Sequence, residues 1–174
     1  MRRRRRLHRR DRAQFRRDAP LALDRFLPHR IARLAATLRK LGERVLAVRF
    51  GIAADEWQLV AALGEGAPLS AAMLAQRTTV DPGRALRVAQ GLARRGLVER
   101  EPDAFDARRI SFRLSLKGRA LYRRVAPGAR AQERALLASL TPVEQRDLER
   151  SLAKLQRQAE RVLGVPSAEP GADG

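Results

Sequence analysis

The chain has 174 residues, of which 44% are hydrophobic, so its length and composition fit one globular domain with a core of its own. Its formal net charge of +18 comes almost entirely from arginine and indicates a polyanionic partner. The absence of cysteine excludes disulfides, Cys-based zinc sites and thiol chemistry, and the lack of a long apolar run or a signal-peptide core favours a cytoplasmic protein.

Residues 1–20 form an Arg-rich arm that we expect to be disordered in the free protein. Within residues 1–18, ten arginines stand against two aspartates, and a like-charge block of this kind cannot build a core. The arm could follow DNA phosphates or enter a minor groove. A solvated tail and a translation start placed too early are the alternatives, and they stay open.

A long helix is predicted to start near Pro28, because proline suits the first helical turn. Its apolar residues are spaced alternately by four and three, and they are Leu27, Ile31, Leu34, Leu38, Leu41, Val45 and Val48. This spacing is a heptad seam about 21 residues long. Such a seam can pack in the core of a monomer, but one this regular more often meets another long helix, which could belong to a second subunit.

Residues 55–63 predict a short second helix, after Gly51 has ended the first pattern. Trp57, Val60 and Leu63 would face the core. Core packing is the more common role for the only tryptophan of a chain, and ligand stacking is the alternative.

Residues 71–77 predict a third helix, with Ser70 as its N-cap and Leu74 turned toward the core. Residues 78–80 form the turn that leads to the next helix. Two short helices joined by a tight turn make this region a helix-turn-helix candidate.

Residues 81–96 predict a DNA-recognition helix. Asp81 can cap it, Pro82 suits its first position and Gly96 can end it. The residues expected to pack inward are Ala85, Val88, Ala89 and Leu92, and those on a separate cationic face are Arg84, Arg87 and Arg94. Guanidinium groups on such a helix can contact base edges and phosphates. For the helix taken alone, an ordinary solvated basic face is the alternative.

After Gly96 the spacing changes from helical to alternating, which predicts a β-hairpin. Residues 97–100 form its first strand and residues 101–109 a turn-rich loop. On the return strand Ile110, Phe112 and Leu114 alternate with Ser111, Arg113 and Ser115. A hairpin directly after a recognition helix favours a winged helix over a plain helical bundle. Arg108 and Arg109 at the loop tip suit a narrow minor groove or flanking phosphates.

Two further helices are predicted beyond the hairpin. Ser115 can cap the first of them, in which we expect an interruption with a kink at Pro127 and Gly128 before residues 129–140 resume. Residues 141–144 form a capping box that opens the last helix. Its apolar residues again follow a heptad seam, and they are Leu148, Leu152, Leu155, Ala159 and Val162.

The order of a long helix, three short helices, a hairpin and two long helices resembles the MarR family of bacterial winged-helix regulators over about residues 25–163. The residues that carry the resemblance are Asp55-Glu56-Trp57, Pro68-Leu69-Ser70, Leu74-Ala75, Arg87, Leu92, Gly96-Leu97-Val98-Glu99-Arg100, Asp103, Asp106, Arg108, Leu114-Ser115 and Lys117-Gly118. Each is weak alone, and their order and spacing together are fairly specific.

The resemblance implies a mainly α fold with a small β-hairpin, in which a winged helix-turn-helix is flanked by long dimerisation helices. The implied domains are the arm at 1–20, a dimerisation helix at 21–50, the DNA-binding region at 51–115, two dimerisation helices at 116–163 and a disordered tail at 164–174. The implied protein is a homodimer that binds double-stranded DNA, with half-sites roughly 34 Å apart on a roughly palindromic operator. The heptad seams from Leu27 and Leu148 favour the dimer independently.

Family positions that contact DNA correspond to Gly83, Arg84, Leu86 and Arg87 in the recognition helix and to Arg108 in the wing. We expect Arg84 and Arg87 to contact bases and phosphates, and Arg109 to assist Arg108. Ser70 and Thr78 are further candidates for phosphate contacts, and Asp106 is similar to the family's wing aspartate, which usually orients an arginine.

Four residues depart from the family's usual recognition helix. Pro82 and Gly83 replace polar side chains at its start, and Leu86 occupies a commonly polar position that faces DNA. Gly91 stands where an arginine is common, at a cost of about 1 kcal/mol relative to alanine. These departures leave fewer base-reading groups than usual.

The resemblance also implies a small, often aromatic effector, bound where the dimerisation helices meet the winged helix. His29, Arg49, Phe50 and Trp57 could line such a pocket, although ordinary packing explains Phe50 and Trp57 equally well. No metal or other cofactor is expected.

The sequence predicts a dimeric, nucleoid-associated transcriptional regulator, and specifically a repressor that blocks a promoter. A sequence-tolerant architectural DNA-binding protein is one alternative, suggested by the Arg-rich arm. A winged-helix module whose arginines meet acidic protein or RNA is another. An enzyme is the weakest class, because the chain has no His pair, no cysteine, no phosphate loop and no distinctively spaced carboxylate pair.

Overall fold

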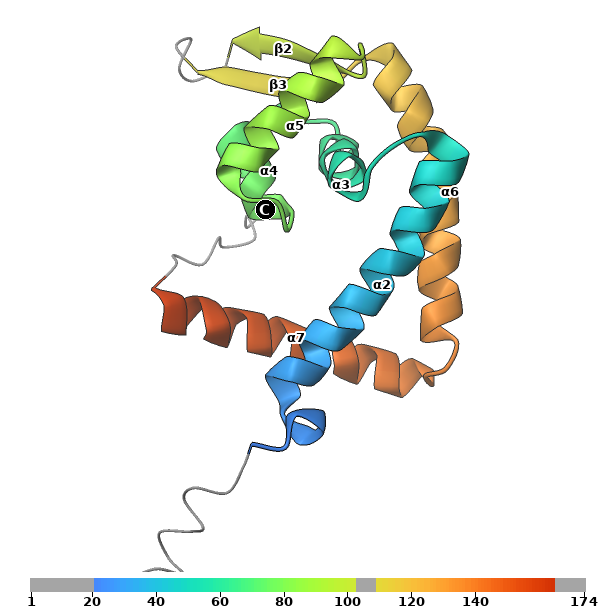
Figure 1. The fold of residues 1–174 in the computed structure, drawn as a ribbon, viewed down its shortest axis with the longest axis vertical. Coiled ribbons are helices and arrows are strands. Elements are labelled where there is room, and N and C mark those ends of the chain that lie inside the picture. Colours follow the sequence, from blue (N-terminus) through green and yellow to red (C-terminus); the bar gives the residue numbers. More distant parts are fainter. Residues whose placement is uncertain (1–20, 103–108, 165–174) are drawn as a thin grey trace, which may run out of the picture.

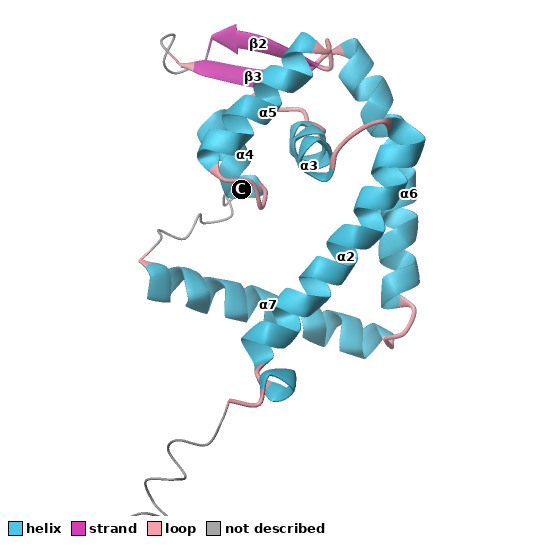
Figure 2. Ribbon diagram, in the orientation of Figure 1, coloured by secondary structure: helices cyan, strands magenta, loops and turns pink. Residues whose placement is uncertain are grey.

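The computed structural model describes residues 21–102 and 109–164 of the chain. The Arg-rich arm, most of the hairpin loop and the predicted C-terminal tail beyond Gly164 therefore lie outside the described residues. The elements in chain order are η1 (Leu23–Arg25), α2 (Leu27–Phe50), α3 (Ala54–Leu63), β1 (Leu69–Ser70), α4 (Ala71–Arg77), α5 (Pro82–Arg94), β2 (Val98–Pro102), β3 (Ile110–Leu114), α6 (Leu116–Leu137) and α7 (Pro142–Leu163) (Figure 2). Within these ranges no helix is both long enough and apolar enough to cross a membrane.

The elements separate into a compact part and a group of long helices (Figure 1). In that view α3, α4, α5 and the sheet gather at the upper left, and the long α2, α6 and α7 form the right and lower sides. The mainly helical fold with a small sheet is thus as predicted, with the predicted recognition helix α5 directly before the hairpin.

The predicted N-caps are confirmed. Oxygen atoms of Ser70, Asp81 and Ser115 accept from backbone N–H groups three residues later, at 3.3, 2.9 and 3.0 Å. At the start of α7, Thr141 and Glu144 form the predicted capping box, with the Thr141 N–H and hydroxyl both donating to Glu144 Oε2 at 2.8 Å. These two hydrogen bonds lower the pKa of Glu144 below its ordinary value, because they favour the ionised carboxylate.

The core lies between α3, α4, α5, the sheet and the first half of α6. Its largest fully buried side chains are Phe112, Ile52, Leu59, Leu69, Leu74, Leu92, Val60 and Val125. Val60 and Leu63 face inward as predicted, and the half-buried Trp57 also packs against this core and stacks on Tyr122 with 6.0 Å between ring centroids. Each fully buried side chain of this size contributes about 1.5–3 kcal/mol to the free energy of folding.

The sheet is antiparallel and three-stranded, in the order β1-β3-β2. The hairpin of β2 and β3 confirms the prediction, but β1 was predicted only as the start of a helix. The predicted alternation on β3 is wrong at its first two residues, because Ile110 is 43% exposed and Ser111 is buried. Ser111 pairs with Ser70 on one side and Glu101 on the other, while Ile110 lies beyond the end of β1.

The predicted interruption of α6 is also wrong, since the helix runs unbroken from Leu116 to Leu137 with Pro127 inside it. Val125 and Ala126 are buried just before the proline, and their packing offsets the lost backbone hydrogen bond. In Figure 1 the two halves of α6 run in different directions, so the predicted kink is present although the helix does not end at it.

The long helices leave their apolar seams open to solvent. On α2 only Leu46 is buried, and α7 has no buried residue. The exposed apolar residues of the two seams include Leu27, Ile31, Leu34, Leu41, Val45, Leu148, Leu152, Leu155 and Val162. The heptad spacing predicted from the sequence therefore exists on real helices, but it does not pack into this chain's own core.

Candidate nucleic-acid interface

Helix α5 has one packed face and one open, cationic face. Ala85, Ala89 and Leu92 are completely buried, whereas Arg84 and Arg87 are exposed. Leu86, on the open side, is 41% exposed. The amphipathic pattern predicted for this helix is confirmed, and its cationic face is exposed to solvent.

Arg84 is held by a carboxylate of the neighbouring helix. Its Nε donates to Asp55 Oδ2 in the first turn of α3, and the pair is also an ion pair. The Arg84 side chain stays 58% exposed, and that of Asp55 is 24% exposed. The sequence prediction contained Arg84 but not its partner, since 29 positions separate the two residues.

Arg87 lies one turn further along α5, and its guanidinium reaches back toward Gly83. A Cβ atom placed on Gly83 would lie 3.7 Å from Arg87 Nη1 and 3.5 Å from Asp81 Oδ1. Within the described ranges, Arg87 takes part in no ion pair. Its charge is therefore available to a phosphate or a base.

Helix α3 is joined to both ends of α5 by polar contacts. Gln58 Oε1 accepts from the N–H and the hydroxyl of Thr79, both at 2.9 Å, in the turn before α5. After α5, Arg95 Nη1 donates to both oxygens of Glu56 at 2.8 and 2.9 Å, and Arg95 Nη2 donates to the Gly51 carbonyl at 2.9 Å. Sequence reasoning missed these contacts because they join residues far apart in the chain.

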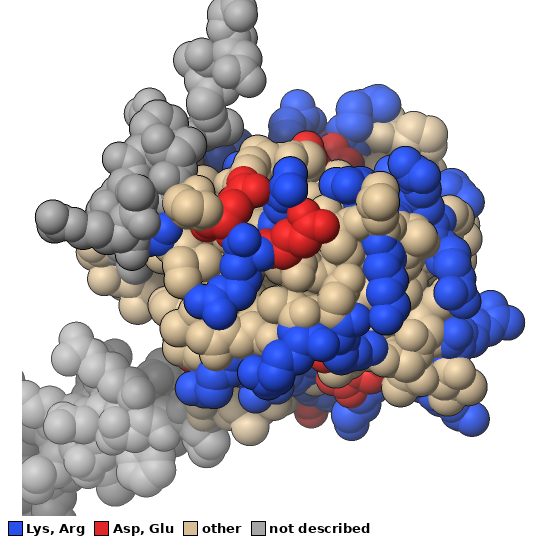
Figure 3. Space-filling view, turned by 90° about the horizontal axis from the view of Figure 1, so that it is seen from above, with Lys and Arg blue, Asp and Glu red and all other residues tan. Residues whose placement is uncertain are grey.

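The hairpin presents a mixed surface. Arg113 of β3 binds Glu99 at 2.9 Å and Glu101 at 3.0 Å, so its charge is balanced within the strands. Arg109 is exposed at the start of β3, and Arg108 lies outside the described residues. Seen from above, basic side chains spread over much of the molecule, and acidic side chains show in several smaller places among them (Figure 3).

Ser70 and Thr78, the two candidates for phosphate contacts, differ in whether their hydroxyl hydrogen is still free to be donated. Ser70 Oγ accepts from Met73 N–H, which leaves its own hydrogen available to a phosphate. Thr78 Oγ1 donates to the Leu74 carbonyl at 2.7 Å and accepts from Val80 N–H at 3.3 Å, so its only hydrogen is in use.

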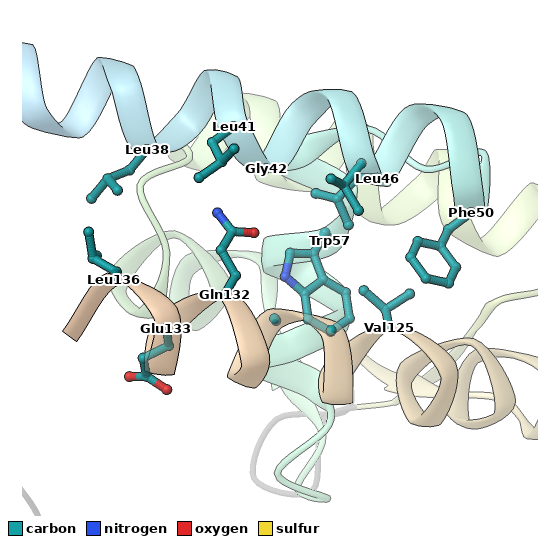
Figure 4. A pocket seen from close by; sticks show the side chains of 13 residues that line it. Leu38, Leu41, Gly42, Leu46, Phe50, Trp57, Val125, Gln132, Glu133 and Leu136 are labelled. Carbon is teal, nitrogen blue, oxygen red and sulfur yellow. The ribbon is translucent and has the colours of Figure 1, made fainter. Parts of the chain in front are cut away.

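A cavity of about 330 Å³ lies between α2, α3 and α6 (Figure 4). Phe50 and Trp57, two of the predicted pocket residues, line it. The other two do not. His29 is in the first turn of α2, roughly 30 Å along the helix from Phe50. Arg49 is exposed, because successive residues of a helix point about 100° apart and its neighbour Phe50 is the one that faces the cavity.

The walls of this cavity are mainly apolar. Leu38, Leu41, Leu46 and Leu136 face it from α2 and α6 in Figure 4, and Gln132 supplies an amide there. Sequence reasoning missed the α6 residues, because nothing local links residues 125–136 to α3. Among the described residues, no group of His, Cys, Asp or Glu side chains could hold a metal ion.

The MarR family model matches residues 50–109, which run from the end of α2 to the end of the hairpin loop. The HTH-type transcriptional repressor Rv2887 of Mycobacterium tuberculosis is 32% identical to this chain over 135 residues, covering 78% of this chain and 96% of the relative. The chain belongs to the MarR family. It is therefore a winged-helix, DNA-binding transcriptional regulator, as the resemblance implied.

Solved structures of MarR regulators share the fold of this MarR protein. A MarR/EmrR family regulator from Acinetobacter sp. ADP1 aligns with a TM-score of 0.76 at 23% identity, over 81% of this chain and 99% of that one. The PcaV regulator from Streptomyces coelicolor, solved in complex with its natural ligand, aligns with a TM-score of 0.70 at 24% identity, over 82% and 99%. The alignments span the long helices as well as the winged helix-turn-helix.

Proposed function

We propose that this MarR-family protein is a homodimeric repressor that binds a roughly palindromic operator and is released from it by a small apolar or aromatic effector. The observation that carries the proposal is α5, a helix with a buried apolar face and an open face bearing Arg84 and Arg87. One α5 helix from each subunit enters the major groove, in half-sites roughly 34 Å apart. The protein acts in the cytoplasm, at the nucleoid.

Direct contacts to DNA are assigned to α5 and the hairpin. Arg84 and Arg87 contact base edges and phosphates, with Leu86 beside them against a thymine methyl group and Gly83 allowing close approach of the backbone. Arg109, together with Arg108 at the predicted wing tip, contacts flanking phosphates or the minor groove. Ser70 retains a hydroxyl hydrogen for a phosphate, whereas the hydrogen bonds of Thr78 give that residue less support.

The dimer follows from the exposed seams of α2 and α7. Leu27, Leu34 and Leu152 are each about half exposed, on helices whose apolar residues keep heptad spacing. Soluble proteins rarely leave contiguous apolar stripes of this extent in water. A second copy of the chain supplies matching helices, because a seam that packs against itself forms a two-fold symmetric interface.

The effector is assigned to the cavity between α2, α3 and α6. Its volume lies within the range of small-molecule sites, and Trp57 and Phe50 give it aromatic walls with the Gln132 amide as a polar contact (Figure 4). A ligand there shifts the protein away from DNA only if it binds the DNA-free arrangement more tightly than the DNA-bound one.

Fluorescence anisotropy tests the proposal, with the DNA upstream of the protein's own gene and a scrambled duplex compared between about 50 and 200 mM salt. A specific regulator keeps tight binding to one duplex at the higher salt concentration. Equal binding to both, lost steeply with salt, would instead favour the sequence-tolerant architectural protein that the net charge of +18 allows. No binding to either duplex at moderate salt would favour the module that binds acidic protein or RNA.

A further inference from the structure

The ion pair between Arg84 and Asp55 uses only part of the arginine. A guanidinium carries five N–H donors, and the contact to Asp55 Oδ2 is made by Nε alone. Among the described residues, the Nη1 and Nη2 groups of Arg84 have no hydrogen-bond partner. These two end groups form the fork that matches N7 and O6 of guanine in the major groove.

Asp55 is itself held in place relative to the recognition helix. Its helix α3 is fixed at one end of α5 by Gln58 and at the other by Glu56. Between these contacts, Ala85 and Ala89 of α5 are completely buried in the core that α3 shares. The backbone that carries Asp55 is therefore fixed relative to α5, and an arginine paired with its carboxylate loses less side-chain freedom on binding DNA than a free one.

The surroundings leave the outer end of Arg84 open. More than half of its side chain is exposed despite the ion pair, and the preceding residue, Gly83, has no side chain that could cover it. Arg84 is also the third residue of α5, in the turn from which recognition helices contact bases.

We propose that Asp55 is a positioning residue for DNA readout, which holds Arg84 through Nε so that Nη1 and Nη2 bind N7 and O6 of a guanine in each half-site. The inference rests on the proposed function, since it needs α5 to enter the major groove. It adds a residue outside the recognition helix to the set that determines sequence preference, and it names the base that is read.

Selection of bound duplexes from a randomised library tests the inference, with each variant's preference counted position by position. The wild-type protein is expected to select guanine at one position of each half-site. Arg84→Lys, which keeps the charge but lacks the fork, is expected to lose about 5- to 150-fold of that preference. Asp55→Asn is expected to lower the preference at the same position only, because its amide holds Nε less tightly.

Glu65→Gln is the matched control, because it also removes one carboxylate that pairs with an exposed arginine, Arg77, at 2.7 Å. Both Asp55→Asn and Glu65→Gln raise the net charge by one, so any general gain in DNA affinity appears in both. Only Asp55→Asn is expected to change the guanine preference. Equal thermal midpoints of the wild type and the variants show that each is folded.

The possible outcomes distinguish failure of the role of Asp55, failure of the assignment of Arg84 to guanine, and failure of the proposed function. If Arg84→Lys removes the guanine preference and Asp55→Asn leaves it intact, Asp55 has no positioning role. If Arg84→Lys changes no position, the assignment of Arg84 to guanine is overturned while specific binding stands. If the wild type selects no sequence at all, the proposed function fails together with the inference.

Discussion

Gly118, in the first turn of α6, is the glycine whose replacement we expect to cost most. A Cβ atom at this position would lie 1.9 Å from the Leu97 carbonyl oxygen and 3.2 Å from Leu114 Cδ2. The Leu97 oxygen also accepts the Ser115 N–H at 3.1 Å, and Ser115 Oγ donates to the Gly96 carbonyl at 2.7 Å. Gly118→Ala therefore forces apart the junction between α5, the hairpin and α6.

The magnitude follows from these contacts. Overpacking of a rigid site costs about 1–3 kcal/mol, and here the obstacle is backbone, so the upper part of that range applies. Loss of the hydrogen bond between Ser115 and Leu97 adds about 0.5–1.5 kcal/mol. The better helix propensity of alanine returns about 1 kcal/mol. We expect a net loss of about 1.5–3.5 kcal/mol in the free energy of unfolding, or about 3–14 °C in the thermal midpoint.

Circular dichroism melts at one fixed protein concentration measure this loss, because the midpoint of the proposed dimer would depend on concentration. Gly91→Ala in α5 is the control, since the nearest atom to its added Cβ is the flexible Arg94 Nη2 at 3.8 Å. That variant is expected to gain about 0.5–1 kcal/mol. A Gly118→Ala protein that melts at or above the wild-type midpoint would refute the argument from close backbone approach.

The other predictions concern assembly, pH and charge. Leu152→Glu places a carboxylate in the exposed seam of α7 and is expected to shift the protein from dimer to monomer in sedimentation velocity; an unchanged dimer would exclude this seam from the interface. The lowered pKa of Glu144 means that its capping box stabilises the fold above pH about 4.5 and ceases to do so as the pH falls through the lowered pKa. Melts of the wild type and Glu144→Gln should therefore differ near neutral pH and converge in acid, and a constant difference would contradict the assignment. Arg87→Ala is expected to reduce the salt slope of DNA binding by about one, as loss of one phosphate contact requires; an unchanged slope would remove Arg87 from the phosphate contacts.

The helices and their starts could be predicted from the sequence because the signals that set them are local. Asp81, Ser115 and Thr141 each cap a helix through a backbone N–H only three residues away. The alternating residues of the hairpin and the heptad seams are also patterns within one segment. These local signals were enough to indicate the family and the position of the recognition helix.

The parts that the sequence did not predict depend on contacts between distant segments. The two-residue strand β1 exists because Leu69 and Ser70 pair with β3, and this pairing also buries Ser111. The helix α6 continues through Pro127 because the core holds the residues before it. Neither effect leaves a signal in the neighbouring sequence.

The candidate site also combines residues that local patterns predict with residues that depend on contacts between distant segments. Arg84 and Arg87 could be named from the spacing on one helix, but the partner of Arg84 lies in α3 and needed the fold. Of the predicted pocket residues, Phe50 and Trp57 line the cavity, while the wall from α6 was not predicted because it reaches α3 only through tertiary packing. His29 lies too far along α2 to reach the cavity, and Arg49, although next to Phe50 in the chain, does not line it.

The exposure of helix α7 has a consequence for how fast the protein is degraded by proteases. The helix spans 22 residues with no buried side chain, and helices in proteins owe most of their stability to the packing of an apolar face. If a second copy supplies that packing, dilution exposes α7 to proteases as well as separating the subunits. We then expect cleavage within α7 to rise as the protein becomes scarce, so that a small pool of the regulator is degraded faster, molecule for molecule, than a large one.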